Sequence, residues 1–225
     1  MRRIPRLLRV PLYLLGSWLA LFAIVNVVIV LAGVASRWAG KDPQLRDDDW
    51  PDISHLRLVD DTVAFGAQPT PEDYEALADH GVTTVVDFRE GGPAPDEPGR
   101  DDPAALARLG IDDHPLAVTD GEAPSERDVR EFLAIVDDAD GRVFAHCSGG
   151  VGRSTTMAAV YQAARGQDPS VLEQVAVGPP TIEQVWFVGT LRPDHPEHRI
   201  NPVIAGVSRV VDYPRTLWGI VTSPF

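Results

Sequence analysis

One nine-residue stretch decides the fold, and it reads His146-Cys147-Ser148-Gly149-Gly150-Val151-Gly152-Arg153-Ser154. An apolar run over residues 142–146, typical of a buried strand, precedes it, and a helix-like pattern follows it. Its three glycines allow a tight turn in which successive backbone N–H groups face one centre at the amino end of a helix. The stretch therefore predicts an anion-binding loop between a strand and a helix.

Two reactive side chains stand at the ends of this loop. Cys147 is the only cysteine of the chain, and the positive field of the loop favours its thiolate, which is the nucleophilic form. The planar guanidinium of Arg153 can hold two phosphoryl oxygens while charge spreads over them in the transition state. The phosphate-binding residues expected beside it are Ser148, Gly149, Gly150, Val151 and Gly152. Ser154 can donate its hydroxyl to the sulfur or cap the helix, and His146 can orient the loop or pack as a buried histidine.

Outward from the loop, short apolar runs alternate with helix-like segments. Strands are predicted near residues 56–59, 62–65, 82–88, 111–118 and 142–146, the first two as a hairpin. Helices are predicted over residues 103–109 and after the capping residues Thr70 and Ser125. This alternation predicts an α/β fold with a mostly parallel, twisted sheet flanked by helices, and with ligands at the carboxyl ends of the strands.

An apolar segment precedes this domain. Between Arg9 and Arg37 lie 27 positions without a charged residue. At about 1.5 Å per residue, a helix of that length exceeds the roughly 30 Å hydrocarbon core of a bilayer. The segment therefore predicts one transmembrane helix over residues 10–36. A cleaved signal peptide that ends near Val34-Ala35-Ser36 is the competing interpretation, although secretory apolar regions usually span only about 7–15 residues.

Charge is distributed unevenly along the chain. Four arginines precede the apolar segment, and Arg37, Lys41 and Arg46 follow it, a bias that favours an extracytoplasmic domain and leaves the side of the membrane open. The first 41 residues hold six basic residues and no acid, so 14 basic and 33 acidic residues, a net charge of −19, remain in residues 42–225. Such a field repels nucleic acid, and a phosphorylated ligand has to be captured locally.

The pattern His-Cys-x-x-Gly-x-x-Arg-Ser resembles the signature loop of the cysteine-dependent protein-tyrosine and dual-specificity phosphatase superfamily, in particular its compact dual-specificity-like members. The resemblance extends over about residues 55–192 and includes residues 65–69, 85–89 and 178–184. It implies a phosphatase domain over residues 53–199. The other predicted parts are a basic flank (1–9), the transmembrane helix (10–36), an acidic linker (37–52) and a C-terminal arm (200–225).

The resemblance also implies a general acid that protonates the departing oxygen. Asp120 lies 27 residues before Cys147 and resembles the acid of the compact members. Asp112 and Asp113 are the alternative candidates, and a solvated turn aspartate beside Gly121 is the alternative role for Asp120.

Three further residues have weaker assignments. Gln184 resembles the glutamine that positions the hydrolytic water in related enzymes, or is a surface residue. Asp87 and Arg89 are expected to form a structural pair at a strand end. No His-rich, Cys-rich or paired-carboxylate pattern indicates a metal, and the implied mechanism needs neither a metal nor another cofactor.

The implied reaction is hydrolysis of phosphomonoesters through a cysteinyl-phosphate intermediate, with phosphotyrosine on protein as the first substrate and phosphoserine or phosphothreonine if the pocket is shallow. A rhodanese-like sulfurtransferase and a catalytically inactive phosphoprotein-binding module are the alternatives. The expected partners are phosphorylated proteins and, through the N-terminal helix, a membrane, whereas the oligomeric state is left open.

Overall fold

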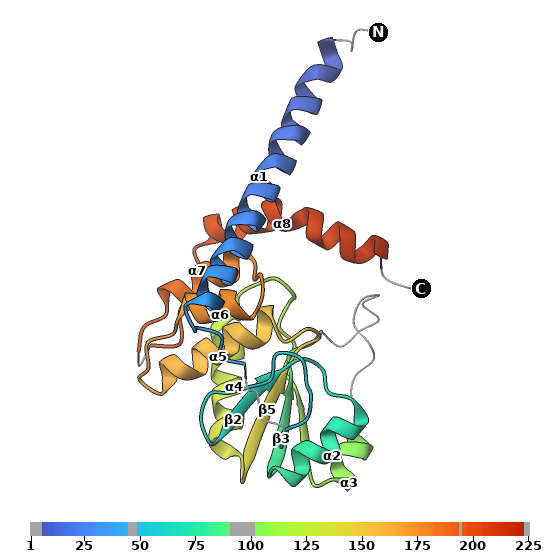
Figure 1. Cartoon of the computed structure of the whole chain (residues 1–225), viewed down its shortest axis with the longest axis vertical. Helices are drawn as coiled ribbons and strands as arrows, with labels where there is room; N and C mark the ends of the chain where they lie inside the picture. The colour runs from blue at the N-terminus through green and yellow to red at the C-terminus, as the bar shows by residue number, and fades with distance from the viewer. Residues whose placement is uncertain (1–5, 45–48, 91–101, 194, 223–225) are drawn as a thin grey trace.

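A computed structural model of the chain describes residues 6–44, 49–90, 102–193 and 195–222 (Figure 1). Residues 1–5 of the predicted basic flank and residues 45–48 of the predicted linker lie outside the described residues. The elements are α1 (Arg6–Trp38), β1 (Arg57–Leu58), β2 (Val63–Gly66), α2 (Pro71–Asp79), β3 (Val82–Asp87), α3 (Pro103–Arg108), β4 (Asp112–Pro115), α4 (Glu126–Asp138), β5 (Arg142–His146), α5 (Gly152–Ala164), α6 (Val171–Val177), α7 (Ile182–Thr190) and α8 (Pro202–Thr222).

The five strands in the described residues form one sheet in the order β1-β2-β5-β3-β4. β1 pairs antiparallel with β2, as the predicted hairpin requires, whereas β2, β5, β3 and β4 run parallel. The predicted α/β fold with a mostly parallel sheet is therefore confirmed. Because β5 lies between β2 and β3, the loop that follows His146 leaves from the middle of the carboxyl edge of the sheet.

Both faces of the central strands β2, β3 and β5 are buried, which explains why these strands contain runs of consecutive apolar residues rather than a strict alternation. Along β3, Val85 belongs to one apolar cluster and Val86 to the other. Along β5, Phe144 belongs to the same cluster as Val85, and Ala145 belongs to the same cluster as Val86. All four side chains are fully buried, so the central strands are held between two packed layers that fix the carboxyl edge in place.

Side-chain caps begin two helices where the sequence predicts them. The hydroxyls of Thr70 and Ser125 each accept a hydrogen bond at 3.2 Å from the backbone N–H three residues on, at Asp73 and Asp128. Each aspartate accepts in return from the N–H of its capping residue at 2.8 Å. These reciprocal bonds satisfy backbone donors that have no partner within the helix. They define where α2 and α4 begin.

The N-terminal helix α1 extends slightly beyond the predicted span of residues 10–36. Its stretch Val10–Trp38 is long and apolar enough to cross a membrane, a property that signal sequences share. The guanidinium of Arg37 donates to the carbonyls of Ala176 and Val177 at the end of α6, so the last turn of α1 is attached to the domain. Figure 1 shows the rest of α1 passing α8 and rising away from the sheet.

The predicted C-terminal arm consists mainly of helix α8, which packs on α7. Its residues Ala205, Ser208 and Asp212 are buried, at the spacing of one helical face. Val203 and Val207 on the other side are exposed. The arm is therefore part of the packed structure and lies at the end of the domain that also contacts α1.

Candidate active site

The loop between β5 and α5 has the form that its glycines predict. Gly150 has a positive φ of 69°, a conformation that L side chains rarely adopt. A Cβ atom at this position would lie only 2.6 Å from the backbone nitrogen of Ala67. The carbonyl of Ser148 accepts from the N–H of Gln68 at 3.1 Å, so the loop is also tied to the chain that follows β2. The loop is therefore locked against the sheet at the amino end of α5.

Cys147 and Ser154 face each other across this loop. The Cys147 side chain is buried, and the Ser154 hydroxyl lies 3.1 Å from its sulfur and 3.1 Å from the carbonyl oxygen of Gly66. One hydroxyl proton can serve either acceptor, and a thiolate competes for it more strongly than a thiol does. The alternative role of Ser154 as a helix cap is wrong, because Val151 is the N-cap residue of α5 and makes no side-chain cap bond.

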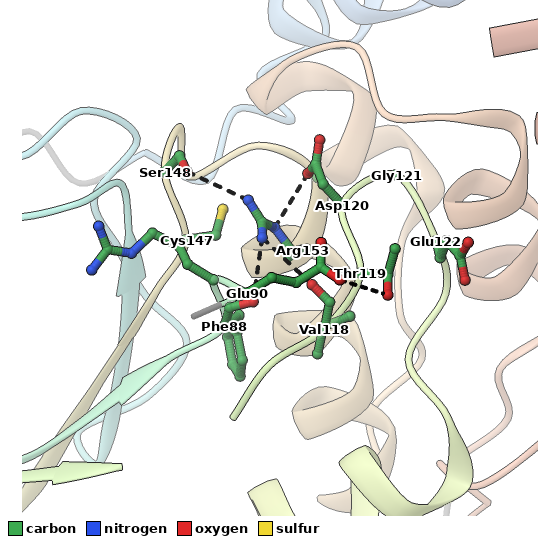
Figure 2. Close-up of polar contacts among 12 residues, drawn as sticks. Phe88, Glu90, Val118, Thr119, Asp120, Gly121, Glu122, Cys147, Ser148 and Arg153 are labelled. Atoms are coloured by element: carbon green, nitrogen blue, oxygen red, sulfur yellow. Dashed lines mark hydrogen bonds and ion pairs between the residues drawn. The ribbon is translucent and has the colours of Figure 1, made fainter. Parts of the chain in front are cut away.

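Arg153 lies in the first turn of α5 with only 3% of its surface exposed. Its Nη1 donates at 3.3 Å to the carbonyl of Phe88 and at 3.4 Å to that of Val118, while Nη2 donates at 3.4 Å to Ser148 Oγ. Figure 2 shows the guanidinium on the side of the loop toward which the Cys147 sulfur points. The thiol and the guanidinium thus share one space, and the long bonds of the guanidinium can be exchanged for bonds to a bound anion.

The predicted general acid lies at the rim of this space. Asp120 Oδ1 is 3.2 Å from Arg153 Nε, and the Asp120 side chain is 71% exposed. The alternative candidates Asp112 and Asp113 belong to the first half of β4, short of its carboxyl end at Pro115. The structure therefore brings Asp120, and neither alternative, to the guanidinium.

Polar contacts beneath the loop hold His146 and the end of β3. His146 is fully buried, with Nε2 3.3 Å from the Tyr74 hydroxyl and Nδ1 4.0 Å from Asp87 Oδ1. The guanidinium of Arg89 donates two bonds of 2.9 Å to the Asp87 carboxylate, which is the predicted structural pair. His146 thus lies beneath the loop and does not face the shared space.

Gln184 is buried, so the interpretation as a surface residue is wrong. Its Oε1 accepts from the N–H of Thr181 at 3.1 Å as part of the cap of α7, and its Nε2 donates to the Glu122 carbonyl at 3.4 Å. A Cβ atom added at Gly152 would lie 3.0 Å from both amide atoms. Gln184 therefore contacts the start of α5 and the acid-bearing loop together.

Arg57 is a residue of this site that the sequence interpretation missed. Its side chain is almost completely buried, its Nη1 donates at 3.4 Å to the Gly150 carbonyl, and its guanidinium lies 5.4 Å from the Phe65 ring centre. Burial lowers the pKa of Arg57 to about 10, and the negative charge available at Cys147 opposes that change. A cation between Leu56 and Leu58 in a predicted strand was the sequence feature that could have revealed it.

A thiol and a guanidinium at the two ends of a glycine-rich loop, placed between the central parallel strand and a helix, define the class of cysteine-dependent dual-specificity-type phosphatases. Residues 50–187 match the family model described as "DSP-PTPase phosphatase fused to NAD+ Kinase". That match covers more than half of the chain, and the chain belongs to this family.

Curated proteins with similar sequences include a beta-lactamase hydrolase-like protein of Agrobacterium fabrum, 28% identical over 109 residues, and the human dual specificity protein phosphatase CDC14C, 32% identical over 95 residues. These matches cover 48% and 42% of this chain, but only 25% and 20% of the respective relatives. Among solved structures, Tk-PTP in its active form is 20% identical with a TM-score of 0.45, and covers 73% of this chain and 98% of its own.

Proposed function

We propose that this chain hydrolyses phosphomonoesters, phosphotyrosine on protein first, through a phosphocysteine intermediate at Cys147. One juxtaposition carries the proposal: Ser154 Oγ lies 3.1 Å from the Cys147 sulfur, and Asp120 lies 3.2 Å from the guanidinium at the other end of the same loop. The family and the curated dual-specificity relatives support this chemistry.

In the first step, the Cys147 thiolate attacks phosphorus and the bond to the ester oxygen breaks. Arg153 and the backbone amides of residues 148–152 bind the phosphoryl oxygens, whose charge grows in the transition state. Asp120, in its protonated form, gives its proton to the departing oxygen, so that the leaving group departs as a neutral alcohol or phenol.

In the second step, water attacks the phosphocysteine and the P–S bond breaks. Asp120, now a carboxylate, takes a proton from the water, and the Ser154 hydroxyl donates to the departing thiolate. Inorganic phosphate leaves and the starting state is restored. A positioning role for Gln184 toward this water is part of the proposal, because its side chain contacts the start of α5.

The charges around the loop favour singly phosphorylated groups. Residues 148–152 contain no lysine or arginine, and the domain as a whole is acidic. A ligand with additional phosphates, such as a phosphoinositide, would find no matching cations inside the loop. The likeness to dual specificity protein phosphatases supports a phosphoprotein substrate, with phosphoserine or phosphothreonine as further substrates.

We also propose that α1 anchors the enzyme in a membrane as a single span. The length and apolar composition of Val10–Trp38 support this, and the excess of arginines before the span favours an extracytoplasmic domain. Protease treatment of intact cells tests it, since an extracytoplasmic domain is cleaved without lysis and a cytoplasmic one is protected. A shortened mature chain would instead indicate a cleaved signal peptide.

The full chain in detergent micelles, assayed on p-nitrophenyl phosphate and on a phosphotyrosine peptide, tests the enzymatic proposal. We expect turnover of both, and a loss on the order of 10⁴-fold or more in Cys147→Ser, because the nucleophile is removed. Turnover that survives in Cys147→Ser would contradict the proposal.

Two other outcomes would assign the chain to the alternative functions. Cyanide-dependent cleavage of thiosulfate in the absence of phosphatase turnover would indicate a sulfurtransferase. Binding of the phosphotyrosine peptide without hydrolysis would indicate a phosphoprotein-binding module.

A further inference from the structure

In the acid loop, residues 118–123, the residue that follows Gly121 faces away from the shared space. Asp120 points toward Arg153, whereas Glu122, on the other side of Gly121, points to the opposite side of the loop (Figure 2). There, Glu122 Oε2 accepts from Arg209 Nη2 at 2.7 Å. The loop is thus held from both sides by guanidinium groups, one from α5 and one from α8.

Arg209 also contacts a buried carboxylate of α7. Its Nε lies 3.4 Å from Glu183 Oε2, and Glu183 has only 1% of its side chain exposed. The other oxygen of Glu183 accepts from the N–H of Ala123 at 3.1 Å. One guanidinium therefore joins two consecutive residues of the acid loop, Glu122 directly and Ala123 through Glu183.

The part of α8 that presents Arg209 is itself fixed to the start of α7. The neighbouring Ser208 hydroxyl accepts from the N–H of Glu183 at 2.9 Å and donates to the Asp212 carboxylate at 3.1 Å. Asp212 also accepts from the N–H of Ile182 at 3.4 Å, a favourable place for a negative charge at a helix amino end. The segment of α8 that carries Arg209 is therefore fixed to α7 by hydrogen bonds.

These contacts affect the geometry of the acid loop more than the stability of the fold. Arg209 is 55% exposed and Glu122 is 31% exposed, and pairs this open to solvent usually add little to the free energy of folding. Burial raises the pKa of Glu122, and Arg209 opposes that change. Glu183 differs, because a buried carboxylate that loses its cationic partner is left as an uncompensated charge and reorganises its surroundings. Its surroundings include the N–H of Ala123, three residues from the acid.

We propose that Arg209 is a positioning residue for the general acid, acting through Glu122 and Glu183 on the loop that carries Asp120. The inference rests on the proposed role of Asp120. Arg209 lies beyond residues 50–187, the part that matches the family model, so the C-terminal helix adds this contact to the family's core. It follows that α8 contributes to the chemistry of the domain and does not merely cover α7.

The same turn of α8 also contacts the N-terminal helix. The indole N–H of Trp18 donates at 2.6 Å to the carbonyl of Val210, the residue after Arg209, and the Trp18 and Tyr213 rings lie 6.3 Å apart. Figure 1 shows α1 and α8 crossing at this level. Tests of the proposal therefore use the full chain, with α1 present.

The first test measures amide hydrogen exchange and does not depend on activity. In Arg209→Ala we expect the amides of residues 120–123 to exchange roughly tenfold faster, because the Glu183 bond to Ala123 loses its support. Arg209→Lys retains one charge without the planar fork and should restore protection only in part. Arg199→Ala is the matched control, since it removes another exposed pair, with Glu126 at 3.1 Å, at the start of α4 and outside residues 118–123. Unchanged exchange in Arg209→Ala would refute the proposal.

The second test uses the leaving group of the substrate. A poor leaving group needs a proton from the acid, whereas 2,4-dinitrophenolate departs without one. In Arg209→Ala we expect kcat/KM to fall about tenfold on phenyl phosphate and to change little on 2,4-dinitrophenyl phosphate, because a misplaced acid costs roughly this much or more. An equal fall in kcat/KM on both substrates would show that Arg209 has only a structural role.

The two tests separate the failure of this inference from the failure of the proposed function. If the wild-type chain hydrolyses neither phosphate ester, the proposed function is wrong. Faster exchange in Arg209→Ala would then still establish the contact between Arg209 and the loop. The inference would nevertheless be overturned, because the contact would have no catalytic purpose. If the wild type is active and Arg209→Ala matches Arg199→Ala in both tests, only the inference is wrong.

Discussion

The nucleophile loop, residues 147–153, and the acid loop, residues 118–123, meet at Arg153 but are built differently. Cys147 and Arg153 are each 3% exposed, whereas the Asp120 side chain is 71% exposed. Backbone atoms at the end of β2 and in the two residues after it hold the first loop, through contacts at Gly150 and Ser148. The comparison teaches that the groups proposed to bind the phosphoryl oxygens are fixed by the core.

Contacts with neighbouring segments hold the acid loop in place. Val118 is buried at its start, but beyond it the supports are polar contacts such as the Thr181 hydroxyl on the Gly121 carbonyl at 2.6 Å and the Thr119 hydroxyl on Glu90 at 3.0 Å. A group that gives up a proton and then takes one from water needs access to both substrate and solvent. Segments with few buried apolar contacts are also the ones that move most readily to close over a ligand.

The largest effect that distinguishes the two loops is expected for Arg153→Lys. A lysine keeps the charge but cannot hold two phosphoryl oxygens in one plane, so we expect kcat/KM to fall on the order of 10³-fold and phosphate inhibition to weaken as well. Steady-state kinetics with p-nitrophenyl phosphate measure both. Arg130→Lys, at an exposed pair with Glu197, is the control and should behave as wild type.

Asp120→Asn should affect only the chemical step. We expect kcat/KM to fall about 10²-fold because proton transfer to the leaving oxygen is lost, while phosphate inhibition stays at the wild-type value. The fall should be much smaller on 2,4-dinitrophenyl phosphate, whose leaving group departs without a proton. If this difference between substrates is absent in Asp120→Asn and present in Asp112→Asn, the acid is assigned to the wrong residue.

A pair of glycine substitutions compares the mechanical rigidity of the loops. Gly150 and Gly121 both have positive φ, but an added Cβ meets backbone at 2.6 Å in the first and a Thr181 methyl at 3.2 Å in the second. We expect Gly150→Ala to lower the free energy of unfolding by at least about 2 kcal/mol and Gly121→Ala by about 1 kcal/mol. Denaturant unfolding measures both, and a larger loss in Gly121→Ala would reverse the comparison.

The smallest effect is expected for Arg57→Met, beneath the nucleophile loop. Replacing a buried cation by an apolar chain should raise the free energy of unfolding by about 1 kcal/mol at pH 8. Above a pH of about 10, the pKa of folded Arg57, the unfolded chain holds this proton more tightly than the folded chain does. Wild-type stability then gains relative to the variant as pH rises, and the difference should shrink.

A second measurement on Arg57→Met concerns the thiol. Alkylation of Cys147 by iodoacetamide at pH 7 should slow in the variant, because a thiolate loses a neighbouring positive charge. A stability difference that widens above pH 10, or alkylation that speeds up, would show that Arg57 does not bear a buried charge beside the sulfur.

Local patterns were sufficient to predict the sheet, the caps and the nucleophile loop. The run before Cys147, the glycines after it and Arg153 lie within the twelve residues 142–153, and the caps at Thr70 and Ser125 each act over three residues. Interactions over such short separations are set by backbone geometry and periodicity, which a sequence shows directly. Cys147, Arg153 and Asp120, which the structure brings to one place, were therefore selected as candidates from the sequence.

Tertiary structure alone decided which distant residues support that loop and the acid. Arg57 meets Gly150 across 93 positions of chain, and Arg209 meets Glu122 across 87. Nothing in the residues around Arg57 or Arg209 specifies these partners, because long-range pairs arise from the packing of β1 beside β2 and of α8 on α7. The amino-acid pattern determined which chemistry the loop can perform, and the packing determined which charges surround it.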